Sequence, residues 1–184
     1  MSITEEGRTA ILLDLIHRLG VAGSWCGETH IQKAVYFLQE AAGQDLGFQY
    51  LLYKHGPYSF ELRDELYSLW ALGQLALKPQ EPPYGPRWEV VARHARTGAS
   101  GAQAPAAGRD ELAAVVEWLG DKGVVELERL STALWARSEM PDQPEPARAA
   151  RVRELKPHIG PEEAAEAVAA VERMLSAARP AHKP

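Results

Sequence analysis

The sequence of 184 residues has little of what cross-links, metal sites and membrane spans require. Cys26 is the only cysteine, so the chain cannot form an internal disulfide, and no group of Cys and His residues at metal-ligand spacing surrounds it. No apolar run approaches the roughly 18 residues of a membrane span, and the first residues lack the basic region of a signal peptide. We therefore expect a cytoplasmic protein that holds no metal and enters no membrane.

Sequence motifs for phosphate loops, nucleophile elbows and zinc proteases are also missing. The chain has no Gly-x-x-x-x-Gly-Lys, no Gly-x-Ser-x-Gly and no His-Glu-x-x-His. His17 falls on the polar side of its helical pattern and His30 opens the next one, so both are expected at the surface or at a helix end. These absences predict no cofactor and no enzymatic activity.

Concentrated positive charge is lacking as well. The formal net charge is −5 and the isoelectric point is near 5.7, whereas nucleic-acid-binding domains often exceed a value of about 9. The one basic group is formed by Arg148, Arg151 and Arg153, which do not share one helix face. Nucleic acid binding is therefore the less favoured alternative.

The hydrophobic periodicity that is present predicts a mainly α-helical (α+β) fold. Residues 4–19 and 29–42 form helical stripes, residues 47–53 read as a strand, and residues 59–73 form a third helix capped by Ser59. Short strands at 75–77 and 88–91 flank a proline-rich turn and would form a β-hairpin. This order is compatible with a winged-helix-like N-terminal half.

The second half of the chain is predicted to be helical, which gives three regions. We expect a winged-helix-like domain over residues 1–96, a flexible linker rich in small residues over 97–108, and a helical region over 109–180 packed on the first half. The expected helices in the last region cover residues 109–119, 124–137, 147–155 and 161–178.

The best candidate site joins the end of the first strand to the start of the third helix. There Tyr53, Lys54, His55, Gly56, Pro57, Tyr58 and Ser59 combine aromatic, cationic and turn-forming residues. We add Lys33 and Tyr36, three apart on the second helix, and Glu61 from the acidic third helix as candidate partner-binding residues. The alternative reading of this segment is that Gly56 and Pro57 only shape a turn while the tyrosines pack.

Two segments carry a family resemblance. The run from His30 to Glu40 (His-Ile-Gln-Lys-Ala-Val-Tyr-Phe-Leu-Gln-Glu) and the run from Tyr53 to Leu62 resemble the paired motifs of YwgA-like, Panacea-type proteins, with His55 where an aromatic residue is usual. The same pattern is similar to the C-terminal module of DarG-type antitoxins. The resemblance covers residues 12–75 and implies a module that binds a toxin and blocks its DNA site. The macrodomain that precedes this module in those antitoxins is absent here, so glycohydrolase activity is not expected.

Three functions remain open, of which an enzyme with an unrecognised site is the least favoured. The first is an antitoxin-like or defence-associated protein that neutralises or regulates a protein partner, such as a toxin encoded by an adjacent gene. The alternative is a winged-helix transcription regulator that binds DNA as a homodimer.

Overall fold

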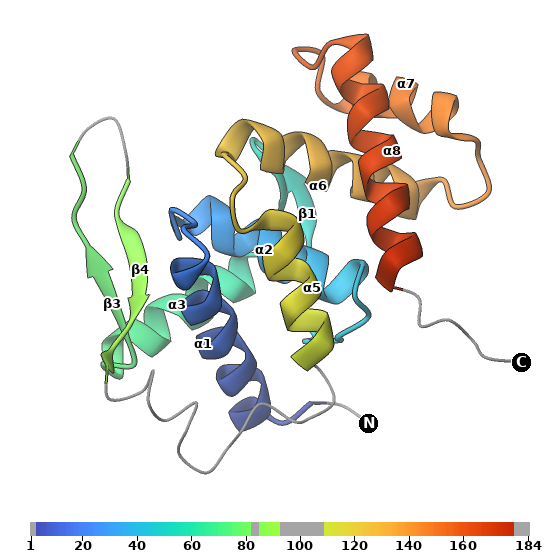
Figure 1. The fold of residues 1–184 in the computed structure, drawn as a ribbon. Helices are drawn as coiled ribbons and strands as arrows, with labels where there is room; N and C mark the ends of the chain where they lie inside the picture. Colours follow the sequence, from blue (N-terminus) through green and yellow to red (C-terminus); the bar gives the residue numbers. More distant parts are fainter. Residues whose placement is uncertain (1–2, 82–84, 93–108, 179–184) are drawn as a thin grey trace, which may run out of the picture.

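The computed structural model describes residues 3–81, 85–92 and 109–178. Most of these residues are helical and the strands form two small antiparallel hairpins, which confirms the mainly helical class (Figure 1). The helices are α1 (Glu5–Val21), α2 (Glu28–Glu40), α3 (Phe60–Ala71), α5 (Arg109–Leu119), α6 (Val124–Glu139), α7 (Glu145–Leu155) and α8 (Pro161–Ala178). The strands are β1 (Leu51–Tyr53), β2 (Gly56–Tyr58), β3 (Leu75–Lys78) and β4 (Arg87–Val90). The linker expected at 97–108 lies outside the described residues.

The helix starts follow the caps that the sequence offers. Thr4 caps α1 by accepting a hydrogen bond from the Gly7 amide at 3.1 Å, and Ser59 caps α3 by accepting one from the Leu62 amide at 3.2 Å. The second helix begins at Glu28, one residue before the range expected from the sequence, and its N-cap is Gly27. The Cys26 carbonyl accepts a hydrogen bond from the Trp88 amide at 2.8 Å, which ties the start of α2 to β4.

The strand expected over residues 47–53 is shorter than predicted. Only residues 51–53 pair with another strand, because the Phe48 main chain bonds the Gln39 side chain instead. Gln39 Nε2 donates to the Phe48 carbonyl at 2.9 Å, and the Phe48 N–H donates to Gln39 Oε1 at 3.1 Å. β1 pairs with β2 in the register Leu51 to Tyr58 and Tyr53 to Gly56. The expected turn is therefore the two-residue loop of a small hairpin.

The second hairpin matches the sequence pattern. β3 and β4 pair antiparallel with Leu75 opposite Val90 and Leu77 opposite Trp88. Trp88 is 2% exposed and fills the space between this hairpin and the rest of the core. In Figure 1 the hairpin projects from one end of the molecule, opposite α7 and α8.

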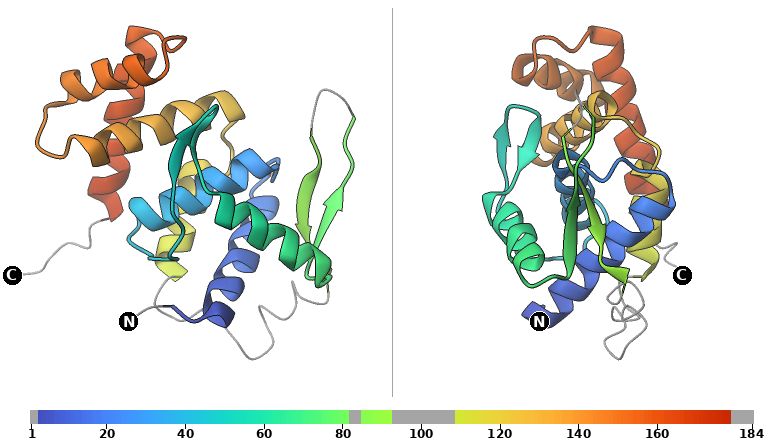
Figure 2. Two further views of the ribbon diagram at one scale, coloured as in Figure 1. Left: turned by 180° about the vertical axis from the view of Figure 1, so that it is seen from behind. Right: turned by 90° about the vertical axis from the view of Figure 1, so that its left-hand side faces the viewer.

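The second helix is the centre of the core. Nine consecutive residues of α2, from His30 to Leu38, are buried, because the helix contacts α5 and α6 as well as α1, α3 and β2. The left view of Figure 2 shows the β1–β2 hairpin lying across α2 and α6. A helix covered on all sides can hold its polar side chains only if they find partners inside the protein.

The helices of the second half pack on one another and on α2. The closest associations are α7 with α8 and α6 with both of them. Pro144 is the N-cap residue of α7. The next helix, α8, begins at Pro161 as expected, with the acidic Glu162 and Glu163 in its first turn. Within the described ranges, no helix is both long and apolar enough to cross a membrane.

Candidate functional site

Polar side chains of α2 form hydrogen bonds with the main chain of the β1–β2 hairpin and of Ser59, which follows it. The Gln32 amide makes two hydrogen bonds to the Ser59 backbone: its Nε2 donates to the carbonyl at 2.8 Å and its Oε1 accepts from the N–H at 2.9 Å. Both residues are fully buried. Gln32 thus fixes the point where β2 passes into α3.

Lys33, expected as a partner-binding residue, is 1% exposed and directed into the protein. Its Nζ donates to the Pro57 carbonyl at 2.8 Å. Burial lowers the pKa of Lys33 to about 8, against the attraction of Glu128, and the charge of Lys156 lowers it further. This lysine therefore contacts the main chain of the hairpin and not solvent.

The turn itself requires a glycine. Gly56 has φ +89°, and a Cβ there would lie only 2.8 Å from Ser131 Oγ and 3.5 Å from Lys33 Cε. The backbone of β2 therefore approaches α6 more closely than a side chain would permit.

A second buried lysine holds the other side of the turn. Lys156, which follows α7, donates to the carbonyls of Tyr53 at 2.9 Å and Lys54 at 2.5 Å. Its Nζ lies 3.3 Å from Glu128 Oε1, and the two side chains are 8% and 10% exposed. Glu128 Oε1 has no hydrogen-bond partner among the described residues, so Lys156 and Glu128 interact through the attraction of their charges.

Two histidines border the same carboxylate. His55 Nδ1 lies 3.8 Å from Glu128 Oε2 and His158 Nε2 lies 3.6 Å from Glu128 Oε1, and both imidazoles are more than half exposed. Among the described residues no group of three His, Cys, Asp or Glu side chains could hold a metal ion. The arrangement is suited to fixing the conformation of the turn, because its buried cations are directed at main-chain oxygens.

The outer side of the hairpin carries three aromatic rings, which we call the aromatic patch: Tyr53, Tyr58 and Phe60. The ring centroids are 5.1 to 6.0 Å apart, and Tyr53 and Phe60 are 56% and 41% exposed. The Arg63 guanidinium lies 5.0 Å from the centroid of the Phe60 ring. The Tyr58 hydroxyl donates to Glu28 Oε1 at 2.6 Å, which ties the patch to the start of α2.

The predicted site residues fall into two groups. Exposed or half-exposed on the hairpin and the first turn of α3 are Tyr53, Lys54, His55, Tyr58 and Glu61, whereas the buried group consists of Lys33, Tyr36, Gly56, Pro57 and Ser59. Tyr36 lies apart from the patch, because its ring packs on Tyr50 at 4.9 Å and on Trp135 at 6.3 Å.

Sequence reasoning missed several members of the site. Phe60 had a detectable signal, since it is a large apolar residue that falls off the buried stripe of α3. Gln32, Glu128 and Lys156 gave none, because a polar residue in a helical pattern is ordinarily assigned to the surface.

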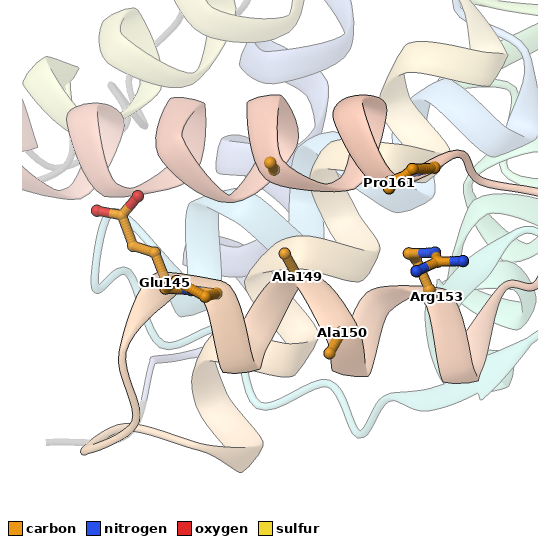
Figure 3. A pocket seen from close by; sticks show the side chains of 7 residues that line it. Glu145, Ala149, Ala150, Arg153 and Pro161 are labelled. Carbon is orange, nitrogen blue, oxygen red and sulfur yellow. The ribbon is translucent and has the colours of Figure 1, made fainter.

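A separate hollow of about 680 Å³ lies between α7 and α8. In Figure 3, Arg153 lies near Pro161 at one end and Glu145 at the other, with Ala149 and Ala150 between them. The predicted site residues do not line it.

Comparison with protein-family models finds no match to this sequence, and comparison with curated proteins finds none either.

Proposed function

We propose that this chain is a non-catalytic, antitoxin-like module that neutralises or regulates a protein partner through the aromatic patch. The observation that carries the proposal is a cluster of exposed aromatic rings on a hairpin whose main chain is fixed by buried side chains. Exposed aromatic residues on a rigid support are the groups that concentrate binding energy in protein interfaces. The partner we propose is a toxin encoded by an adjacent gene, met in the cytoplasm.

The proposal does not include catalysis, because the site's buried lysines are already occupied. Lys33 and Lys156 donate to backbone carbonyls of the turn, and neither is positioned as a free base or nucleophile. The exposed Lys54 and His55 form the two-residue loop between β1 and β2.

We also propose that the resemblance to YwgA-like, Panacea-type proteins reflects kinship. Its support is that the two resembling segments contact each other: Gln32 of the first bonds Ser59 of the second, and Lys33 bonds Pro57. Such pairing explains why the two segments would occur together.

The experiment is co-expression with the product of the adjacent gene and measurement of the dissociation constant. Replacing Tyr53 and Phe60 together by alanine should weaken binding at least tenfold, on the scale of about 1–2 kcal/mol for each interface aromatic. The matched control is Trp70→Ala on the far end of α3, where the ring is 49% exposed but outside the patch. Full binding by a double variant with the wild-type melting temperature would reject the patch as the interface.

The alternative, a winged-helix DNA-binding regulator, has one observation in its favour. α3 is followed directly by the β3–β4 hairpin, which is the order of a recognition helix and its wing. Against it, α3 presents Glu61 and Asp64 to solvent, whereas Arg148 is buried and bonded to the Met140 and Pro141 carbonyls. DNA affinity that falls steeply with salt and survives loss of the aromatic patch would favour this alternative.

A further inference from the structure

A hollow of about 550 Å³ lies between the start of α2, the start of α6 and the β3–β4 hairpin. Its volume is in the range of small-molecule sites. Aromatic rings line it from three segments, namely Trp25, Tyr67 and Trp88, with Tyr67 and Trp88 in edge-to-face contact at 5.3 Å. Walls of this kind favour a flat ligand.

Two helix N-termini open on the same hollow. Gly27 is the N-cap of α2 and Gly123 is the N-cap of α6, and both line it. Neither helix has a side chain that caps its first N–H groups. Hydrogen-bond donors of the main chain are therefore available here, because glycine has no side chain to satisfy them.

His30 supplies an acceptor at this place. It lies at the helix end expected from the sequence but is only 6% exposed, and its Nδ1 is buried without a hydrogen-bond partner among the described residues. A Cβ at Gly27 would lie 3.7 Å from that atom, so Nδ1 is beside the N-terminus of α2. Burial lowers the pKa of His30 by more than the Lys122 carbonyl raises it, so the ring is neutral and carries a lone pair.

The charges around the hollow decide between a charged and a neutral ligand. Each helix N-terminus contributes roughly half a positive charge. Glu28, which also lines the hollow and accepts from the Tyr58 hydroxyl, contributes one negative charge. These contributions cancel approximately, which disfavours a phosphate or carboxylate and favours an uncharged ring with both donors and acceptors.

We propose that this hollow binds a planar, uncharged heterocycle with a cyclic amide edge, as in a pyrimidine or purine base. The ring N–H donates to His30 Nδ1, the adjacent carbonyl accepts from the first N–H groups of α2, and the ring face lies against Tyr67, which lines the hollow and is 43% exposed. Glu28 lines this hollow and bonds Tyr58 of the aromatic patch, but the contacts proposed here do not rest on the function proposed for the patch.

The test uses nucleosides whose amide edge can be blocked. Uridine and inosine should bind saturably in isothermal titration, whereas 3-methyluridine and 1-methylinosine, which lack the ring N–H, should bind at least tenfold more weakly. A uridylate tetramer distinguishes the source of the base: binding tighter than that of uridine identifies a base within a strand, and equal binding identifies a free nucleoside.

The matched variants are His30→Phe, which keeps a ring but removes the acceptor, and His17→Phe, which makes the same change at an exposed position. Only the first should reduce uridine affinity, again by at least tenfold. A folding defect in His30→Phe would mimic a binding defect. The Nδ1 nitrogen-15 resonance of His30 is therefore followed in the wild-type protein, where uridine should shift it and 3-methyluridine should not. Equal binding of blocked and unblocked nucleosides, an unshifted resonance, or no saturable binding of either nucleoside would overturn the proposal.

Discussion

The buried charge of Lys33 should make the stability of this protein rise with pH. Its pKa in the folded protein is about 8, against 10.5 for the unperturbed side chain. Between these values the unfolded chain binds more protons than the folded one, so the free energy of unfolding increases as the pH rises. Below about pH 8 both states carry the charge and the cost of burying it is fully present.

The size of the effect follows from the same two values. A difference of 10.5 − 8 = 2.5 corresponds to about 3 kcal/mol, of which about 2.5 kcal/mol should be recovered between about pH 7 and pH 10. Lys33→Met keeps the length of the side chain and removes its charge. The variant loses the hydrogen bond to the Pro57 carbonyl, a cost of about 1–3 kcal/mol that does not change with pH.

The assay is urea unfolding of both proteins at several pH values in this interval. The wild type should gain about 2.5 kcal/mol relative to Lys33→Met as the pH rises. Taking the difference removes the contributions of buried tyrosines such as Tyr36, whose raised pKa acts in the opposite direction at higher pH. Lys54→Met, at an exposed lysine of the same hairpin, is the control and should follow the wild type. A variant whose stability runs parallel to the wild type at every pH would refute the reasoning.

Three further outcomes are expected. Gly56→Ala should lower the free energy of unfolding by about 1–3 kcal/mol, because an alanine there would have a positive φ and its Cβ would clash with Ser131. The melting temperature should fall accordingly, and an unchanged thermal transition would contradict this. Glu128→Gln should cost about 3–5 kcal/mol in urea unfolding, because buried cations lose their counter-charge, whereas Glu126→Gln on the exposed side of α6 should cost less than about 1 kcal/mol. Cys26 is 2% exposed and burial raises the pKa of its thiol, so it should react with a thiol reagent only in denaturant. Rapid labelling of the native protein would contradict this expectation.

The helices could be predicted because their signals are local. Ser59 as a cap, Pro161 at a helix start and the apolar stripes of α1 and α3 each lie within a few residues of the feature they determine. The strand β2 could not be predicted, since it contains Pro57, and proline within a sheet is confined to edge strands, first strand positions and bulges. Here the partner of β2 is a single short strand, so its proline is tolerated.

The interior of the site depends on contacts between distant parts of the chain. Lys33 bonds a carbonyl 24 positions away, and Lys156 bonds carbonyls more than 100 positions away. A lysine in a helical pattern is almost always solvated, so no local pattern indicates that these two are buried. The residues of the hairpin themselves mark it as the candidate site, whereas the side chains that fix it had to be seen in three dimensions.

The hydrogen bonds of Lys156 also bear on the order in which the protein becomes functional during synthesis. The carbonyls that this lysine holds belong to residues made 103 and 102 positions earlier. Closing so long a loop is slow and entropically costly compared with forming the helices themselves. A nascent chain that has not yet released α7 from the ribosome therefore presents the hairpin without this anchor. The hairpin is therefore fixed on both sides only after Lys156 has been translated, long after the hairpin itself has been made.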